Sequence, residues 1–130
     1  MRVAIPAYSG RISPVFDAAG HLLVIEIVNG RELGRNALVM QAPESLRRAR
    51  WVAGLGVNVL ICGAISWPLA ALLGSAGVSV ISRKCGPVEE VLRAFMSGGL
   101  SEDAFVMPGC RGGRRGKRGG RRGGRPDFNR

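Results

Sequence analysis

Val57 to Ser66, Val-Asn-Val-Leu-Ile-Cys-Gly-Ala-Ile-Ser, is the stretch that decides the fold of this chain. Its core, residues 59–61, is apolar without alternation, which is typical of a strand covered on both faces in a parallel sheet flanked by helices. Three residues suited to a functional role follow. They are Cys62, which carries a thiol, Gly63, which permits a sharp turn or the close approach of a ligand, and Ser66, which can cap a helix. We therefore predict a central strand whose carboxyl end gathers any chemistry.

The sequence on either side alternates between strand and helix patterns. We predict strands over residues 2–6, 22–28, 31–40, 57–62 and 78–81, and helices that begin near Pro43, Ser66 and Pro87. Asn29-Gly30 lies between two apolar runs and is a strong hairpin signal, because both residues tolerate positive φ. Residues 7–14 are rich in turn formers and are predicted to form a loop. On the first helix, Arg47, Arg48 and Arg50 are expected on the outer face.

The order β-β-β-α-β-α-β-α predicts an α/β fold. Right-handed crossovers make the strands at 57–62 and 78–81 parallel neighbours, with the first strand beside them. The result is a mixed five-stranded sheet with an antiparallel hairpin and three helices, in three layers. Ligands in open α/β sheets bind at the carboxyl ends of the strands. The residues expected to converge at that edge are Tyr8, Ser9, Arg11, His21, Cys62, Gly63, Ser66 and Cys85.

The positive charge of the chain is concentrated at its C-terminal end. The net charge is +10, of which residues 1–110 contribute +2 (ten basic, eight acidic) and residues 111–130 contribute +8 (nine basic, one acidic). We predict an α/β domain over 1–100, a closing loop over 101–110 and a disordered Arg/Gly-rich tail over 111–130. Arg-Gly-Gly repeats bind RNA or other polyanions with strong salt dependence, although a solubilising tail or docking on an acidic protein are alternatives. The candidate polyanion-binding residues are Arg111, Arg114, Arg115, Lys117, Arg118, Arg121, Arg122 and Arg125.

The three cysteines lie far apart and form no C-x-x-C pair. The chain shows no charged n-region followed by a long apolar stretch, so no signal peptide is predicted. No window approaches the roughly 18 apolar residues that a membrane span needs. We therefore expect a cytoplasmic protein with free thiols and no membrane partner.

Four segments together resemble the dinitrogenase iron-molybdenum cofactor biosynthesis family. They are Gly-Arg-Ile-Ser-Pro-Val-Phe-Asp at 10–17, the block at 57–66, Ala-Gly-Val at 76–78 and Gly-Pro-Val-Glu-Glu-Val-Leu at 86–92. The resemblance covers nearly all of residues 1–100 and respects the order of the elements. It implies a ribonuclease-H-like fold, a bacterial or archaeal source, and a protein that carries or inserts an iron-molybdenum cofactor or an iron-sulfur precursor. For members outside nitrogen fixation it implies a carrier of a metal cluster or small ligand.

The residues themselves bear on these implications in two ways. A two-metal nuclease would need several carboxylates grouped at the sheet, and the strands at 2–6 and 57–62 contain none, so nuclease activity is not expected. Thiolates and imidazole, by contrast, are ligands that suit iron-sulfur or mixed-metal clusters. The candidate metal ligands are Cys62, Cys85, Cys110 and His21.

Each candidate also has a plainer interpretation. Cys62 at a strand end is by base rate a small core residue, while Cys85 precedes a helix N-terminus, which lowers a thiol pKa. His21 could begin its strand in solvent, and Asp17 could cap a turn. Arg11 could be a solvated loop charge. Cys110 could fold back as a third ligand or have no role.

A bound anion is the alternative to a metal cluster at this edge. The helices that begin after Gly63 and after Gly86-Pro87 would direct two N-termini with free N–H groups toward it. With Tyr8, Ser9 and Arg11 beside them, they could hold phosphate or a nucleotide. Neither a G-x-G-x-x-G motif nor a P-loop lysine makes this site specific.

The function predicted from the sequence is therefore a non-enzymatic metal-cluster carrier that works with cofactor donor or acceptor proteins. The alternatives are a polyanion-binding or RNA-binding module acting through the tail, and a structural interaction protein. An enzyme is not predicted, because the single histidine has no identifiable serine or cysteine partner.

Overall fold

The computed structural model describes residues 1–42, 44–98, 100 and 104–107, so the predictions for 111–130 and for Cys110 lie outside the described residues. Its strands are β1 (Arg2–Tyr8), β2 (Arg11–Ile12), β3 (His21–Val28), β4 (Arg31–Val39), β5 (Val59–Ile61) and β6 (Ser79–Ile81). Its helices are α1 (Ser45–Gly54), α2 (Trp67–Ser75), α3 (Val88–Met96) and the short 3-10 helix η1 (Phe16–Ala18). No helix in the described ranges is long and apolar enough to cross a membrane.

The sheet has the mixed topology expected from the sequence, with the order β4-β3-β1-β5-β6. β5 runs parallel to both β1 and β6, whereas β3 runs antiparallel to β1. The residues of β5 are buried, as predicted. The middle position in the strand order belongs to β1, however, and β5 lies between β1 and β6. The α/β fold is therefore confirmed.

The prediction of a loop over residues 7–14 is wrong in part. β1 continues past Pro6 to Tyr8, and β2 pairs back onto it as a sixth strand. Between them Ser9 (φ 52°) and Gly10 (φ 78°) both have positive φ, which is the conformation of a two-residue hairpin turn. Pro6 does not end the strand, because its carbonyl still accepts the Ser13 N–H at 2.8 Å.

The second hairpin is confirmed as predicted. Asn29 (φ 53°) and Gly30 (φ 75°) turn β3 into β4. The β3–β4 register shifts between Glu26 and Ile27, which face Gly34 and Glu32 respectively. The extra residue, Leu33, forms a β-bulge in β4.

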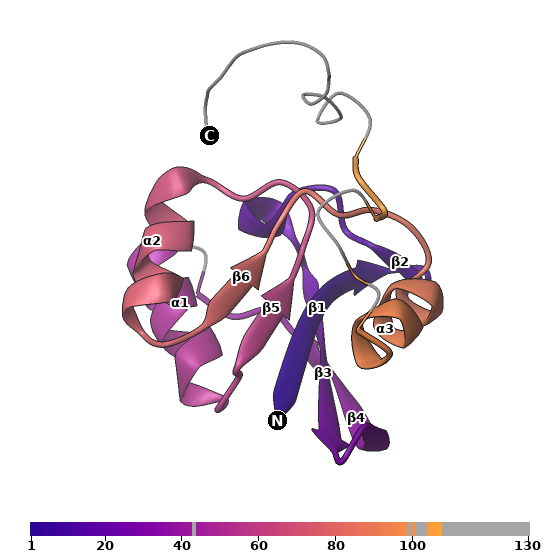
Figure 1. Ribbon diagram of the computed structural model, residues 1–130. Coiled ribbons are helices and arrows are strands. Elements are labelled where there is room, and N and C mark those ends of the chain that lie inside the picture. Colours follow the sequence, from indigo (N-terminus) through magenta and orange to yellow (C-terminus); the bar gives the residue numbers. More distant parts are fainter. Residues whose placement is uncertain (43, 99, 101–103, 108–130) are drawn as a thin grey trace, which may run out of the picture.

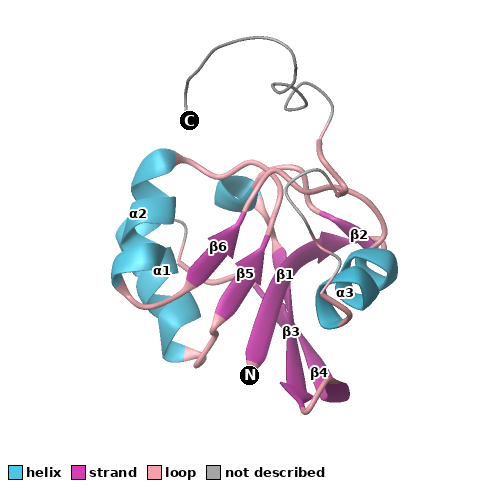
Figure 2. Ribbon diagram, in the orientation of Figure 1, coloured by secondary structure: helices cyan, strands magenta, loops and turns pink. Residues whose placement is uncertain are grey.

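Helices cover the two faces of the sheet, giving three layers (Figures 1 and 2). α1 and α2 pack on one face, where Phe16, Leu60 and Leu73 belong to a single buried cluster. α3 packs on the other face, where Ile5 and Ile61 belong to a second cluster. Residues 60 and 61 of β5 thus face opposite layers, which explains why its sequence is apolar without alternation.

One arginine of α1 is not on the outer face. Arg48 is only 6% exposed, and its guanidinium donates hydrogen bonds to the carbonyls of Phe16 at 2.7 Å and Ala19 at 3.3 Å. Burial lowers the pKa of this group. Arg48 therefore satisfies the backbone around η1 from inside the core, and the prediction of a solvent-facing side chain is wrong.

Candidate functional site

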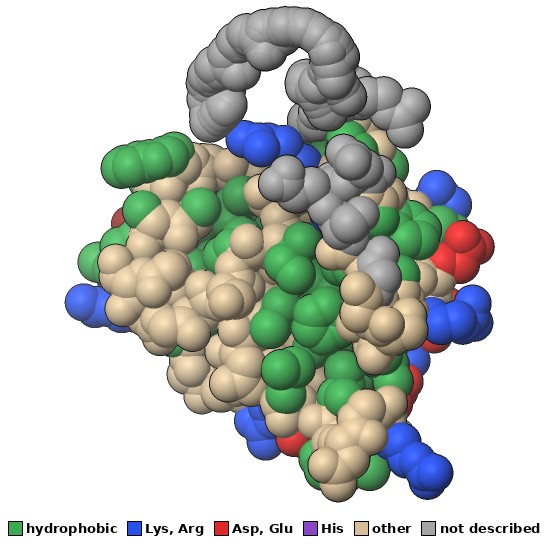
Figure 3. Space-filling model, in the orientation of Figure 1, with side chains coloured by type: hydrophobic (Ala, Val, Ile, Leu, Met, Phe, Trp, Pro, Cys, Tyr) green, Lys and Arg blue, Asp and Glu red, His purple; other side chains and the backbone are tan. Residues whose placement is uncertain are grey.

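The carboxyl edge of the sheet brings the predicted loops together. β1, β5 and β6 are parallel, so the loops that follow them leave at the same edge, the upper one in Figure 1. β3 begins at this edge too, because Pro6 near the end of β1 faces Leu22 near the start of β3. On the face drawn in Figure 3, basic side chains stand at this upper edge.

Backbone hydrogen bonds join the edge loops into one structure. Ile12 N–H donates to Gly86 O at 3.0 Å and Val88 N–H donates to Gly10 O at 2.9 Å, which ties the β1–β2 hairpin to the start of α3. Arg83 N–H donates to Gly63 O at 2.8 Å, which ties the loop after β6 to the loop after β5. Main-chain hydrogen bonds therefore hold the three loops together.

The β1–β2 hairpin presents a phenol and a guanidinium together. Tyr8 and Arg11 are paired directly across its turn, so both side chains project from the same face. Tyr8 is 70% exposed, and Ser9 and Arg11 are exposed as well. An exposed cation beside a phenolic hydroxyl can donate several hydrogen bonds to an anion.

Cys62 lies inside the core rather than at an accessible position. Its exposure is 0%, and it belongs to the cluster between the sheet and α1–α2. Burial, and secondarily the negative charge of Asp17, raise the pKa of this thiol to about 12. Metal ligation by cysteine requires the thiolate, so this environment favours the core interpretation.

Gly63 allows the backbone of Ser13 and Pro14 to pack closely against it, and it leaves no open space for a ligand. A Cβ on Gly63 would lie 2.5 Å from the carbonyl oxygen of Pro14 and 2.9 Å from that of Ser13. Next to it, Ala64 N–H donates to Pro14 O at 2.8 Å. The loop after β5 and the loop after β2 are therefore packed directly on one another.

The prediction that Ser66 caps α2 is confirmed for its position and wrong for its side chain. Ser66 occupies the N-cap position without a side-chain cap bond, and both its N–H (2.8 Å) and its hydroxyl donate to the carboxylate of Asp17. Asp17 lies in η1, 49 residues earlier in the chain. A carboxylate at this position offsets the positive end of the α2 dipole, so Asp17 contributes charge compensation at the start of the helix.

The two helix N-termini offer less to an anion than the sequence suggested. That of α2 already receives the Asp17 carboxylate. That of α3 carries Glu89 and Glu90 in its first turn, and its Val88 N–H is bonded to Gly10. Cationic side chains, rather than helix dipoles, are therefore the stronger anion attractors here.

The other two candidate ligands within the described residues, Cys85 and His21, do not form a metal-binding cluster. Cys85 is partly exposed, and its thiol donates to Val106 O at 3.5 Å. His21 is exposed at the first position of β3, opposite Val39. Within the described residues, no group of three or more His, Cys, Asp or Glu side chains could hold a metal ion.

A short segment of the predicted closing loop completes this edge. Val106 forms a bridge with Lys84, and Cys85 N–H donates to Phe105 O at 2.7 Å. Lys84 is only 4% exposed, and its ammonium donates to Ala104 O at 2.6 Å. The sequence around Lys84 is polar and does not indicate that this residue is buried, because its hydrogen-bond partner, Ala104, lies 20 residues later.

Comparisons with known proteins agree with this architecture. Residues 1–98 match the family model described as dinitrogenase iron-molybdenum cofactor. The chain belongs to this family. A relative, the uncharacterized protein MJ0580 of Methanocaldococcus jannaschii, is 23% identical over 107 residues, which cover 78% of this chain and 91% of the relative.

Solved structures show the same fold. The crystal structure of PH0822 superposes with a TM-score of 0.73 at 22% identity and covers 80% of this chain and 96% of that one. The apo form of the orange protein from Desulfovibrio gigas superposes with a TM-score of 0.66 at 20% identity, covering 81% and 94%. Membership of the family associates this chain with an iron-molybdenum cofactor and with proteins that handle such cofactors.

Proposed function

We propose that the protein binds an anionic metal cofactor of the iron-molybdenum or iron-sulfur type at the carboxyl edge of its sheet. It would carry this cargo between donor and acceptor proteins without catalysing a reaction. One observation carries the proposal: the exposed Tyr8–Arg11 pair is fixed by backbone hydrogen bonds to the segment that contains Cys85. The family match supports a bound cofactor, as does the likeness in fold to the orange protein from Desulfovibrio gigas, whose solved structure is described as an apo form.

The donor set suits a preassembled anionic cluster better than a bare metal ion. A bare ion needs several protein ligands at bonding distance, and the described residues contain no such group. A cluster that arrives with its own sulfur ligands needs charge compensation, hydrogen-bond donors and at most one or two protein bonds. Arg11, the Tyr8 hydroxyl and the Cys85 thiol supply these three kinds of contact.

Such a site also suits a carrier. Because Arg11 and Tyr8 are exposed on a hairpin, cargo held there would remain open to a second protein. Hydrogen bonds and charge can be exchanged for those of an acceptor without breaking many metal–ligand bonds.

Anaerobic reconstitution with iron, sulfide and molybdate, followed by desalting and elemental analysis, tests the proposal. We expect the wild-type protein to retain metal and both Arg11→Gln and Cys85→Ser to retain several-fold less. The matched control is Arg50→Gln, which removes the same charge from an exposed position on α1, and Cys62→Ala is a second control in the core; both should bind as the wild type does. Equal metal content in Arg11→Gln, Cys85→Ser and wild type would remove this edge as the site.

A further inference from the structure

β4 is a long edge strand with one side open. It has nine residues, and among the described residues it pairs only with β3. Along it the side chains are exposed except at Leu38, which is partly buried. Proteins usually shield such an edge with a charge, a proline, a bulge or a covering element, because it can pair with another strand.

The shielding of β4 is confined to one half. The bulge at Leu33 lies before Gly34, and the strand beyond it carries the single charge of Arg35. That guanidinium is already paired with Glu32 and with Glu89 at 2.7 Å. Residues 34–39 therefore form a regular, electrically neutralised edge.

The hydrogen-bonding groups of this half can be assigned from the ladder. Met40 N–H donates to Gly20 O at 2.8 Å, and in an antiparallel pair the inward and outward groups alternate. Gly34, Asn36 and Leu38 therefore direct their backbone groups toward β3. Those of Arg35 and Ala37 point outward, away from the sheet.

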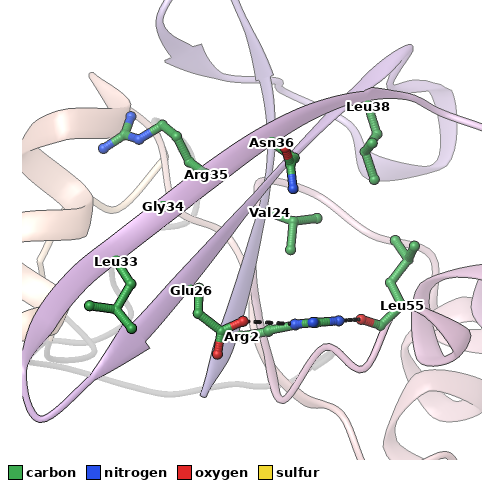
Figure 4. A pocket seen from close by; sticks show the side chains of 9 residues that line it. All are labelled: Arg2, Val24, Glu26, Leu33, Gly34, Arg35, Asn36, Leu38 and Leu55. Carbon is green, nitrogen blue, oxygen red and sulfur yellow. Dashed lines mark hydrogen bonds and ion pairs between the residues drawn. The ribbon is translucent and has the colours of Figure 1, made fainter.

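A groove runs along one face of the same edge. It has a volume of about 510 Å³ and lies between the β3–β4 hairpin and the end of α1. Figure 4 shows Val24 and Asn36 on its floor and the side chains of Leu33, Leu38 and Leu55 around it. Leu33 is 67% exposed, and a Cβ added at Gly34 would meet nothing within 4 Å. The groove therefore has free space above Gly34, with leucine side chains and the Arg2–Glu26 ion pair around it.

We infer that this edge pairs with β4 of a second copy of the chain. In the antiparallel arrangement, residues 34–38 of one copy face residues 38–34 of the other, and Asn36 lies on the two-fold axis. Leu38 of each copy then enters the space above Gly34 of the other and contacts Leu33. The outward backbone groups of Arg35 and Ala37 face those of Ala37 and Arg35 and complete a continuous sheet.

Neighbouring registers fit less well. Opposed residues in an antiparallel pair share a face, so a symmetric pairing can be centred on residue 35, 36 or 37. Centring on Arg35 places two guanidinium groups opposite each other, and centring on Ala37 places Asn36 opposite Leu38. Centring on Asn36 pairs amide with amide and leucine with glycine, so charge and shape both select it.

A short strand pair with two leucine contacts buries less than the roughly 1,200 Å² of a standard interface. The dimer is therefore expected at tens of micromolar protein and not at the lowest concentrations. Sedimentation equilibrium of the full chain across that range should show a mass rising from 13.8 kDa toward twice that value. Asn36→Lys, which places two ammonium groups on the axis, should abolish the rise, while Ser75→Lys at an exposed position on α2 should not.

Disulfide trapping tests the register. On the axis, a pair of residues of the non-hydrogen-bonded kind has Cα atoms about 4.5 Å apart, within the range of a disulfide. Asn36→Cys in a Cys85→Ser/Cys110→Ser background should give a covalent dimer on mild oxidation. Ala37→Cys is the matched control, because its Cα atoms would be about 8 Å apart and should not be bridged.

Three results would overturn the inference. They are a monomer at every concentration, a dimer that survives Asn36→Lys, and equal trapping at positions 36 and 37. A monomer that binds a synthetic extended peptide along β4 would assign the edge to a foreign strand instead.

Discussion

Replacing Gly63 by alanine should disrupt the packing of two loops at the candidate site. The new Cβ would lie 2.5 Å from the Pro14 carbonyl oxygen, 2.9 Å from that of Ser13 and 3.0 Å from the Pro14 carbonyl carbon. All three neighbours are backbone atoms, so none can rotate aside. The strain must therefore be relieved by moving one loop away from the other.

The cost follows from what that movement breaks. Ala64 N–H to Pro14 O and Phe16 N–H to Ala64 O, both 2.8 Å, join the same loops. An added methyl group in a packed site costs about 1–3 kcal/mol, and each weakened backbone hydrogen bond adds about 1 kcal/mol. We therefore expect Gly63→Ala to lower the free energy of unfolding by about 3 kcal/mol.

Urea unfolding followed by far-ultraviolet circular dichroism measures this loss. Gly74→Ala is the matched control, since Gly74 is exposed in α2 and a Cβ there meets nothing within 4 Å. That substitution should stabilise the protein by about 0.5–1 kcal/mol, because alanine loses less backbone entropy than glycine in a helix. If Gly63→Ala unfolds at the wild-type urea concentration, the close approach at Gly63 is not what fixes the loops.

Three further predictions follow from the buried and bonded groups. Burial raises the pKa of Cys62 to about 12. The contribution of Cys62 to the free energy of unfolding is therefore fully present below the ordinary thiol pKa of about 9 and is lost as the pH rises through about 12. Comparing the urea midpoints of the wild type and Cys62→Ala across this pH range checks this prediction. Because Asp17 accepts both Ser66 donors, Asp17→Ala and Ser66→Ala should each cost about 1–2 kcal/mol and should be strongly non-additive in a double-mutant cycle. Arg48→Met removes the charged donor from the Phe16 and Ala19 carbonyls, of which Phe16 keeps the Ala19 N–H, and should cost about 1.5–3 kcal/mol in the same unfolding assay.

The sequence predicted those parts of the fold that depend on local patterns. The unbroken apolar run of β5 indicated burial on both faces, and residues 60 and 61 do face opposite layers. Asn29-Gly30 indicated a hairpin because the turn conformation depends on those two residues alone. The same logic could have been applied to Ser9-Gly10, but the many turn formers around it concealed a second hairpin.

What the sequence could not predict depends on contacts between distant segments. Arg48 was placed on the outer face because helical periodicity treats arginine as polar, whereas its guanidinium satisfies carbonyls about 30 residues away. Asp17 gave no sign of its partner, since Ser66 follows 49 residues later. Gly63 suggested room for a ligand, and only the folded chain shows that the room is filled by backbone.

These distant contacts also change how the edge can attract cargo. With Asp17 bonded at the start of α2 and Glu89 and Glu90 at the start of α3, neither helix dipole faces an incoming anion uncompensated. Attraction must then come from side chains such as Arg11, whose exposed charge is screened by salt within about 10 Å at 0.1 M. Cargo binding should therefore weaken as ionic strength rises, and the salt dependence should be shallower in Arg11→Gln than in Arg50→Gln. Equal slopes in the two variants would show that the cargo is held by bonds to metal rather than by charge at this hairpin.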